Sequence, residues 1–417
     1  MLEKFRTSTP FLIVFFCAIY LNACSTSTPP EPLPSTSPTI TPVRLGPTST
    51  NPPVTPSPSP IPPTATLIPI QPVSDEDWSR GPVDAPITIL VYSDFQCPYC
   101  ADLEGVLEQL REIHGDDIRF VFRHFPLLTI HDKASLAGQA AEAAGDQGDF
   151  WAMHDYLYER QSEWVNLNLP EFNAWLIEAA GKLGIDEEIM AADLQSSRSE
   201  AAMENHFQQG IQSGLTGTPF IFINGTWMRL DPTRLNMEAM VRLELLKVNQ
   251  FEAAPPMSIE VDHQYFARIQ LESGDVVIEL LPDSAPENVN NFIFLAKAGW
   301  FDENSFFRVV EDILVETGDP SGTGYGNPGY FLKDEIDPDV NFNQAGMVAM
   351  SSNGPDTNGS QFFITLSPLP ALNGSRTIFG RVVEGLDVLQ SLRSREPSSD
   401  LLTKSSNGIQ TIDIEVR

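Results

Sequence analysis

Two cysteines separated by two residues are the side chains of this 417-residue chain best suited to covalent chemistry. Cys97 and Cys100 flank a Pro-Tyr pair, whereas the other two cysteines, Cys17 and Cys24, lie near the N-terminus. Two intervening residues allow both sulfur atoms to lie on the first turn of one helix, close enough to bond. At a helix N-terminus, unpaired backbone N–H groups and the helix dipole favour a thiolate over a thiol. The pair is therefore predicted to exchange disulfides, with Cys97 as a nucleophile.

Zinc binding and a purely structural disulfide are the other chemistries open to such a pair. A tetrahedral zinc site needs four ligands, but no second cysteine pair follows and the six histidines show no ligand spacing. A disulfide between positions this close closes too short a loop to stabilise the fold much. We therefore predict redox chemistry, with no metal and no cofactor.

The segments around the cysteines have the composition needed to hold them in place. Residues 87–92, Ile-Thr-Ile-Leu-Val-Tyr, form a continuous apolar and β-branched run that is typical of a buried central strand. Asp94 is placed to cap the helix that follows. The apolar residues of that helix recur at helical spacing, at Leu103, Val106, Leu107 and Leu110. A strand leading directly into a helix that starts at Cys97 is therefore expected.

Length and charge limit the class of protein. A chain of 417 residues is long enough for two or three domains, and a hydrophobic content of 41% supports ordinary cores. The formal net charge of −31 argues against nucleic acid and anionic lipid headgroups as partners, because both would repel the chain. This balance suits a soluble body held away from a membrane surface.

Residues 1–24 are predicted to be a targeting segment. A weakly basic start precedes an apolar run, Phe11 to Tyr20, that is too short to cross a bilayer as a helix of the mature protein. The next four residues, Leu-Asn-Ala-Cys, resemble the lipobox of bacterial lipoproteins, which implies cleavage before Cys24 and lipidation of its thiol. A plain secretory signal and an uncleaved signal anchor are the alternatives. In each case the rest of the chain is exported, and we expect an extracytoplasmic protein that is lipid-anchored to the bacterial cell membrane.

Residues 25–75 are predicted to form an extended, disordered stalk. Pro, Thr and Ser dominate this stretch, which cannot bury enough apolar surface to offset the entropy of ordering. A Pro-rich ligand for a recognition domain is the alternative. Export also places Cys97 and Cys100 in an oxidising or redox-managed compartment. Because no other thiol remains in the mature body, their disulfide partners must be other molecules.

Residues 76–250 are predicted to form the first folded domain. After the cysteine helix, the expected elements are a strand at 118–123, helices throughout 133–214, a strand at 220–223 with an Asn-Gly turn, and a helix from Pro232 to about Val248. The helices within 133–214 are expected to begin near Lys133, Phe150, Glu171, Glu187 and Ser199.

This first domain resembles the DsbA-like branch of the thioredoxin superfamily. The resemblance rests on Asp-Phe-Gln-Cys-Pro-Tyr-Cys at 94–100, on the helical insertion, and on Gly-Thr-Pro-Phe at 217–220. It implies that Cys97 attacks and that Cys100 resolves the mixed disulfide. Tyr99 stands where strongly oxidising members usually carry His, so the direction of electron flow stays open.

The same resemblance gives a role to the second motif. It implies that Pro219 is a cis proline facing the active disulfide. The backbone of Thr218 would then be exposed to an extended substrate, since Pro cannot pair as an interior strand residue.

Residues 251–256 are predicted to be a linker and 257–417 a second domain. Alternating strands are expected at 266–271 and 276–281, with a helix from Ala285 to about Ala298 after them. Many short strands with Gly and Pro turns indicate an antiparallel barrel.

This domain is similar to cyclophilin-type peptidyl-prolyl isomerases over nearly all of its residues. The most specific motif is Gly-Pro-Asp-Thr-Asn-Gly-Ser-Gln-Phe-Phe-Ile at 354–364. The others are Phe-Phe-Arg-Val-Val at 306–310, Gly-Asp at 318–319, Gly-Thr-Gly at 322–324, Leu-Asn-Gly at 372–374 and Ile-Phe-Gly at 378–380. The fold class expected for the chain is an α/β thioredoxin fold with a helical insertion, followed by a mainly-β, cyclophilin-like antiparallel barrel.

The cyclophilin resemblance implies roles for individual residues. Isomerisation needs an apolar slot for the proline ring and a donor aimed at the amide nitrogen, which weakens the resonance behind a barrier of about 18–20 kcal/mol. Arg308 is implied as that donor, with Gln361 holding the substrate carbonyl or orienting Arg308. The backbone of Ser352 and Asn353 would pair with the peptide. The residues implied for the proline pocket are Ile313, Leu314, Phe363 and Leu372.

Several of these positions depart from the family pattern. Family members usually carry Phe and Met at 313–314, Gln at Glu316, an aromatic residue at Ala371 and His at Arg376. The residues present at 313–314 keep the slot apolar. Glu316, placed among the substrate-binding positions, can pair with Arg308 and draw its donors away from the amide. We therefore predict measurable but reduced isomerase activity.

The combined expectation is an extracytoplasmic folding catalyst that exchanges disulfides and isomerises X-Pro bonds. Its expected partners are unfolded or partly folded exported proteins and a membrane or extracytoplasmic redox partner. One alternative keeps the redox enzyme but gives the cyclophilin-like domain only a peptide-binding role. Another makes the thioredoxin-like domain a reductant that repairs exported proteins.

Overall fold

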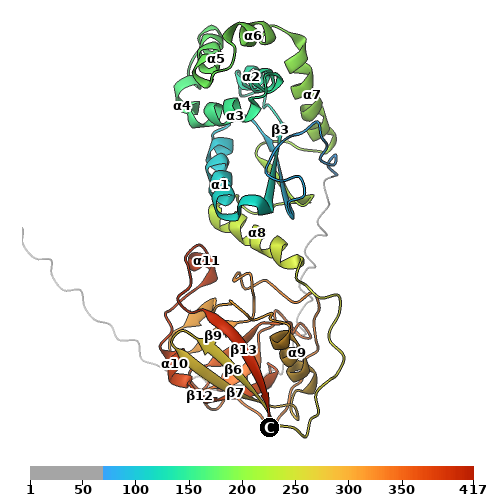
Figure 1. The fold of residues 1–417 in the computed structure, drawn as a ribbon, viewed down its shortest axis with the longest axis vertical. Helices are drawn as coiled ribbons and strands as arrows, with labels where there is room; N and C mark the ends of the chain where they lie inside the picture. Colours follow the sequence, from blue (N-terminus) through green and yellow to red (C-terminus); the bar gives the residue numbers. More distant parts are fainter. Residues whose placement is uncertain (1–68) are drawn as a thin grey trace, which may run out of the picture. The chain divides into compact units, whose positions relative to one another are not determined.

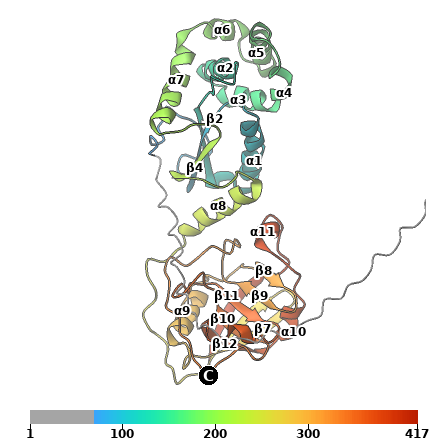
Figure 2. The ribbon, with the colours of Figure 1, turned by 180° about the vertical axis from the view of Figure 1, so that it is seen from behind.

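The computed structural model describes residues 69–417. The predicted targeting segment, Cys24 and nearly all of the predicted stalk therefore lie outside the described residues. Within 69–417 the strands form two separate sheets, one of five strands and one of eight. Each sheet has its own helices, as Figures 1 and 2 show, and its own apolar core. In this range, none of the helices has both the length and the apolarity that crossing a bilayer requires.

The first domain is built on the five-stranded sheet, whose strand order is β1-β3-β2-β4-β5. β2 and β3 are parallel, and the other pairs are antiparallel. Helices α2 to α7 form one insertion between β3 and β4 (Figure 1). The elements are β1 (Trp78–Arg80), β2 (Ile87–Ser93), α1 (Pro98–His114), η1 (Gly115–Asp117), β3 (Ile118–His124), α2 (Ala134–Asp146), α3 (Phe150–Glu159), α4 (Gln161–Trp164), α5 (Leu169–Leu183), α6 (Glu187–Asp193), α7 (Ser197–Gln212), β4 (Phe220–Ile223), β5 (Thr226–Trp227) and α8 (Arg234–Lys247).

The apolar faces read from the sequence are confirmed for β2 and α1. Leu103, Leu107 and Leu110 of α1 are buried against the sheet, together with residues of α8, and Val106 is partly buried beside them. The helical insertion has a core of its own that includes both active-site cysteines. The helices of the insertion begin within two residues of the predicted positions, but β1 and the short α4 were not predicted.

The predicted capping of α1 by Asp94 is wrong. Cys97 is the N-cap residue of α1, and no side chain caps this helix. Asp94 is fully buried and accepts hydrogen bonds from the backbone N–H groups of Gln96 and Leu127, at 2.7 and 2.8 Å. It therefore ties the loop before Cys97 to the loop after β3, which shapes the approach to the helix without capping it.

A buried ion pair holds the N-terminal segment on the sheet. Arg123 of β3 donates from Nε and Nη2 to the two carboxylate oxygens of Asp77, at 2.6 and 2.8 Å. Arg123 also donates to the backbone carbonyls of Gln71 and Pro72, at 2.9 Å each. A buried charge is stable only when it is paired and hydrogen-bonded. These bonds therefore position β1, which the sequence alone did not reveal.

The second domain is built on the eight-stranded sheet, whose order is β13-β6-β7-β12-β10-β11-β9-β8. All pairs are antiparallel, and the sheet curls into a half-barrel in which Ser305 bridges Gly408 between its two ends. The predicted antiparallel architecture is therefore confirmed. The elements are β6 (Tyr265–Leu271), β7 (Gly274–Leu280), α9 (Pro286–Lys297), β8 (Arg308–Val310), β9 (Leu314–Thr317), β10 (Met347–Met350), β11 (Phe362–Thr365), η2 (Pro370–Leu372), β12 (Ile378–Glu384), α10 (Leu386–Gln390), α11 (Pro397–Asp400) and β13 (Ile409–Val416).

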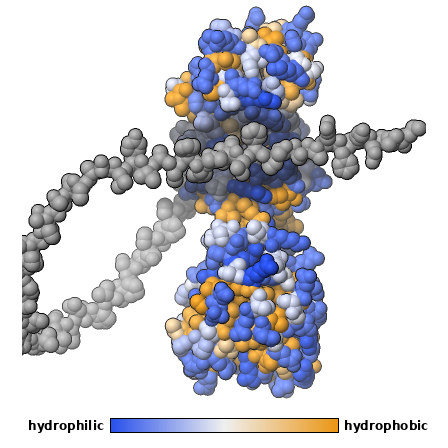
Figure 3. Space-filling model, turned by 90° about the vertical axis from the view of Figure 1, so that its left-hand side faces the viewer, coloured by the Kyte–Doolittle hydropathy of each residue, from blue (hydrophilic) through white to orange (hydrophobic). Residues whose placement is uncertain are grey.

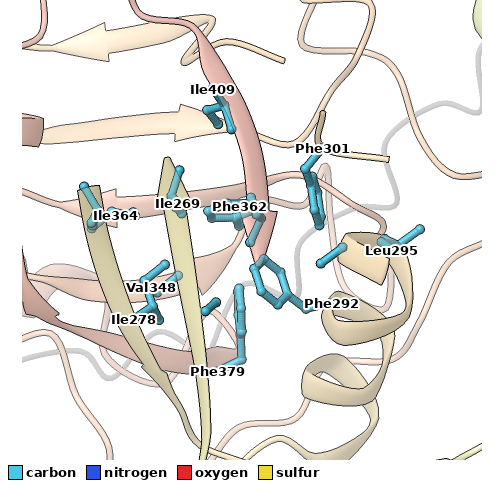
Figure 4. Close-up of a cluster of buried hydrophobic side chains, with 14 of the residues drawn as sticks. Ile269, Ile278, Phe292, Leu295, Phe301, Val348, Phe362, Ile364, Phe379 and Ile409 are labelled. Carbon is cyan, nitrogen blue, oxygen red and sulfur yellow. The ribbon is translucent and has the colours of Figure 1, made fainter. Parts of the chain in front are cut away.

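Helix α9 closes the core of this half-barrel. Figure 4 shows Phe292 of α9 facing Phe362 and Phe379 of the strands. Phe292 and Phe362 meet edge to face, with ring centroids 5.4 Å apart. Such aromatic contacts add to the apolar burial and fix the position of β11, which carries the residues following Gln361.

The start of the predicted linker is packed on the second core. The ring of Phe251 lies 5.0 Å from that of Phe294 and 5.9 Å from that of Trp300, between centroids. Its backbone N–H donates to the carbonyl of Pro328 at 2.8 Å. The first residue of the predicted 251–256 segment is therefore anchored.

Candidate active sites

The first candidate site is the cysteine pair at the N-terminus of α1. Cys97 is the N-cap residue, and Pro98 opens the helix at a position where its missing N–H is not needed. Both cysteines are free thiols, and they are only 3% and 1% exposed. Tyr99 is 70% exposed beside them. The predicted placement of Cys97 at a helix N-terminus is confirmed.

The surroundings shift the pKa values of the two thiols in opposite directions. The hydrogen bond from the Cys100 thiol lowers the pKa of Cys97 to about 6, helped by backbone N–H groups and against burial, which alone would raise it. Burial raises the pKa of Cys100 well above its usual value, and the adjacent Cys97 sulfur adds to that rise. At neutral pH, Cys97 is therefore a thiolate and Cys100 a thiol. Attack by one sulfur and resolution by the other require this division.

The loop before β4 reaches the reactive sulfur. The Thr218–Pro219 peptide bond is cis, and Cys97 Sγ lies 3.8 Å from the carbonyl oxygen of Thr218. Gln161 of α4 donates from Nε2 to the carbonyl oxygens of Phe95 and Cys97, at 2.8 and 3.1 Å. The structure thus brings the two predicted motifs together. Gln161 was missed because the four-residue helix that carries it has no periodic signal.

Two hydroxyl groups lie near Cys100. Ser93 Oγ and Tyr158 Oη lie 2.7 Å apart in the interior. Ser93 also forms a hydrogen bond with the Cys100 thiol, which offsets part of the rise in the pKa of Cys100. Burial raises the pKa of Tyr158 well above its usual value, so this hydroxyl keeps its proton. No sequence pattern joins these residues, which are 65 positions apart.

The second candidate site is centred on Arg308, the first residue of β8. Glu316 of β9 lies opposite Arg308 in the strand register. Arg308 donates from Nη1 to Glu316 Oε2 at 3.3 Å and from Nε to Glu396 Oε2 at 3.2 Å. The predicted pairing of Arg308 with Glu316 is therefore present. Glu396 is a second carboxylate on the same guanidinium, and it was missed because it lies 88 positions away.

The two carboxylates are held differently. Ser351 donates from Oγ to Glu316 Oε1, and the Glu316 side chain is only 11% exposed. The side chains of Arg308 and Glu396 are 43% and 50% exposed. Ion pairs between exposed side chains contribute only about 0–1 kcal/mol. Glu316 is thus the fixed partner of Arg308, and Glu396 is one that a substrate can displace.

Gln361 lies on the other side of Glu316. Its Nε2 donates to the carbonyl of Gly326 at 2.7 Å. Gln361, Glu316 and Asn353 line a cavity of about 80 Å³ together with residues 324–327. Among the described residues no hydrogen bond joins Gln361 to Arg308, so its predicted role toward a substrate carbonyl stays a prediction.

Three of the four residues predicted to line a proline pocket lie together. Leu314, Phe363 and Leu372 belong to one apolar cluster, in which Phe342 stacks on Phe363 with centroids 5.8 Å apart. Ile313 is 44% exposed and lies outside this cluster. Phe342 was not predicted, because it lies in an irregular stretch without hydrophobic periodicity.

The segment predicted to pair with a substrate backbone already has one partner. Arg376 donates from Nη1 to the carbonyl oxygen of Ser352 at 3.0 Å and to its Oγ at 2.6 Å. A carbonyl oxygen has two lone pairs, so it can still accept from a peptide N–H. Asn353 is exposed. Arg376 therefore holds the irregular segment that follows β10 in place.

Comparisons with known proteins match each domain to a family model. Residues 266–414 match the model described as cyclophilin type peptidyl-prolyl cis-trans isomerase/CLD, and residues 74–242 match that described as thioredoxin. The human peptidyl-prolyl cis-trans isomerase-like 1 is 40% identical over 150 residues, which are 35% of this chain and 89% of the relative.

Two solved structures are also similar in part. A cyclophilin type peptidyl-prolyl cis-trans isomerase of Cryptosporidium parvum, crystallised in the presence of the dipeptide ala-pro, is 34% identical, with a TM-score of 0.33, and the match covers 36% of this chain and 98% of that one. Oxidised BdbD from Bacillus subtilis is 21% identical, with a TM-score of 0.38, and the match covers 42% of this chain and 96% of that one.

Fold and sites thus define a two-domain protein, with a thioredoxin-like domain followed by an antiparallel half-barrel of the cyclophilin type. The chain belongs to the cyclophilin-type peptidyl-prolyl cis-trans isomerase family.

The shifted pKa of Cys97 predicts how its reactivity depends on pH. Alkylation of Cys97 by iodoacetamide should rise with pH around a midpoint of about 6, because only the thiolate reacts. Cys100→Ala should move the midpoint upward by removing the principal hydrogen bond. Peptide-resolved mass spectrometry of the reduced full chain measures both. A midpoint near 8.5, the value of an unperturbed cysteine, would contradict this interpretation of the site.

Proposed function

We propose that this chain is an extracytoplasmic folding catalyst that combines thiol-disulfide exchange with peptidyl-prolyl cis-trans isomerisation. The observation that carries the proposal is that one chain holds two separate centres. One is an activated cysteine pair, and the other is an arginine whose strand partner, Glu316, lies opposite Phe363 of an apolar cluster. Disulfide formation and X-Pro isomerisation are both slow steps of folding when uncatalysed. One client protein can need both.

In the exchange reaction, a client thiolate attacks Cys97 Sγ in the oxidised pair, and Cys100 leaves with the electron pair. A second client thiolate then attacks the client sulfur of this mixed disulfide, and Cys97 leaves as a thiolate. Its lowered pKa supports this step, because sulfurs of low pKa leave faster. The backbone of Thr218 lies where it can pair with an extended client segment. A redox partner must then reoxidise the pair.

Exposed apolar residues near Cys97 support binding of unfolded clients. Tyr99, Leu128 and Ile130 are 70%, 54% and 71% exposed, and the last two belong to the loop that Asp94 ties to the cysteine segment. Apolar side chains also gather on the surface of the second domain, as Figure 3 shows. Such patches are typical of surfaces that bind other proteins.

In the isomerase reaction, the apolar cluster around Phe363 would hold the proline ring and Arg308 would donate toward the amide nitrogen. A donor there weakens the resonance of the peptide bond and stabilises the twisted amide. Arg308 must first be released in part from its two carboxylates. The free energy that this release costs adds to the barrier and lowers the isomerisation rate.

The location and the clients are inferred from residues 1–75. We propose lipidation at Cys24, a stalk after it, and exported proteins as clients, with a membrane or extracytoplasmic redox partner. The strongly negative net charge is consistent with a body that does not bind nucleic acid or anionic lipid.

A second candidate function is a redox enzyme whose cyclophilin-type domain only binds client peptides. The observation that favours it is the double pairing of Arg308, which occupies the donors needed for catalysis. A reductant, in place of an oxidant, is the remaining alternative for the first domain, since Tyr99 gives little electrostatic help to a thiolate.

Freeing Arg308 should raise the isomerase rate. Glu316→Gln is expected to accelerate cis-trans exchange of a short X-Pro peptide several-fold, up to about tenfold, which corresponds to about 1.4 kcal/mol. Arg308→Ala should slow it by about 10²-fold to 10³-fold, as for other lost transition-state donors. Glu311→Gln on the same hairpin, exposed and away from Arg308, is the matched control. Equal rates in all these variants would leave peptide binding as the role of the domain.

Refolding of a client with one disulfide and one cis proline tests the combined function. Cys97→Ser should abolish the acceleration of disulfide formation and leave the proline phase intact. Arg308→Ala should abolish the acceleration of the proline phase and leave disulfide formation intact. The activity that each variant keeps shows that the variant is folded. Refolding rates that neither substitution changes would contradict the proposed catalyst.

A further inference from the structure

Cys100 must lose a proton before it can attack, yet it is buried without solvent contact. It is 1% exposed, and burial raises its pKa well above the usual value. Resolution of a mixed disulfide on Cys97 by Cys100 therefore requires a group that takes this proton. In the exchange reaction described above Cys100 leaves, and the same group must then return the proton.

A small cavity adjoins Cys100 and holds unpartnered polar atoms. Its volume is about 10 Å³, roughly the space that one water molecule needs. Ser93, Cys100, Glu104, Arg80 and His154 are among its lining residues. Within the described part of the chain, His154 Nε2 and Arg80 Nε are buried and have no hydrogen-bond partner. Buried polar groups are rarely left unsatisfied, so the cavity is suited to a bridging water.

His154 is oriented to act as a base. Its Nδ1 lies 2.8 Å from Asp155 Oδ1. An ionised carboxylate can only accept, so Nδ1 carries the hydrogen and Nε2 of the neutral ring keeps its lone pair. The rest of the ring is enclosed by aromatic side chains, including Phe95, Phe122 and Tyr158. Nε2 is therefore the basic atom of this ring at the cavity.

Glu104 connects the buried cavity with solvent. It lies one turn beyond Cys100 on α1, and its Oε2 is 3.9 Å from His154 Nε2. It also lines an open cavity of about 340 Å³, together with Asp155, Tyr158, Glu159, Glu108 and Arg111. Arg80 of β1 pairs with Glu104 at 2.6 Å and with Asp155 at 2.9 Å. This positive charge opposes a metal cation among the acidic groups. Against burial, which raises it, His154 and Arg80 together hold the pKa of Asp155 below its usual value.

We propose that His154 accepts the proton of Cys100 through a water in this cavity and passes it to solvent by way of Glu104. The proposal rests on the thiol-disulfide exchange proposed above. As the proton leaves, the Cys100 sulfur uses its electron pair to attack Cys97 Sγ of a mixed disulfide. The Cys97–Cys100 bond forms, the bond from Cys97 to the bound sulfur breaks, and that sulfur leaves as a thiolate. In this step Cys100 is oxidised and the leaving sulfur is reduced. Over formation and resolution of the mixed disulfide together, the cysteine pair loses two electrons to the disulfide that reacted with it.

Acid-quenched oxidation of the reduced full chain by oxidised glutathione separates the steps. Formation of the glutathione adduct on Cys97, read by mass spectrometry, tests the exchange chemistry itself. Decay of the adduct tests the proton route. His154→Phe fits the aromatic surroundings and should slow the decay at pH 7 on the order of 10²-fold, the lower range for a lost general base. The rate of adduct formation should stay unchanged.

The dependence on pH distinguishes a proton role from a structural one. The difference in adduct decay rate between the wild type and His154→Phe should become smaller as pH rises, because Cys100 then loses its proton without a base. Glu104→Gln should also slow the decay of the adduct, by about tenfold, which is within the range of single proton-transfer groups. It serves as the second variant if His154→Phe does not fold. Glu112→Gln, exposed on α1 two turns beyond Glu104 and outside both cavities, should decay at the wild-type rate. Wild-type decay in both test variants, or a slowing that is the same at every pH, would overturn the proposal.

Discussion

A negative charge on the Cys97 sulfur must be stabilised at a place that is almost closed to water, and the first domain is arranged around this requirement. The helix N-terminus and the Cys100 thiol supply hydrogen bonds to the sulfur, while the Thr218 loop and Gln161 enclose it. The same closure makes Cys100 a poor acid. The reactivity of the first sulfur and the inertness of the second therefore have one physical origin, which is burial with unequal access to donors.

In the second domain the central charge is positive, and two carboxylates, Glu316 and Glu396, pair with it. Arg308 keeps enough exposure to meet a peptide, but Glu316 is fixed by Ser351 and lies directly across the strands. A carboxylate in the register position facing Arg308 converts a free donor into a shared one. The cyclophilin-type fold is thus retained, while the donors of Arg308 are shared with Glu316 and Glu396.

Much of this could be predicted from sequence, since it depends on local pattern. The patterns of apolar residues predicted β2, β3, most helices of the insertion and the antiparallel second domain. The spacing of the two cysteines predicted that Cys97 lies at a helix N-terminus. What was missed depends on contacts between distant segments. Asp94 is a residue type that often caps helices, but its side chain accepts a hydrogen bond from the backbone N–H of Leu127. The position of β1 depends on the ion pair between Arg123 and Asp77. Glu396, Tyr158 and His154 act through neighbours that no spacing reveals.

The central claim is that Cys97 forms disulfides with other proteins and that Cys100 releases them. Covalent trapping with a full-chain Cys100→Ser variant tests it most directly. The variant should accumulate mixed disulfides with exported proteins, which dithiothreitol releases and which disappear when Cys97→Ser is added. A folded Cys100→Ser protein that captures no covalent partner would contradict the claim.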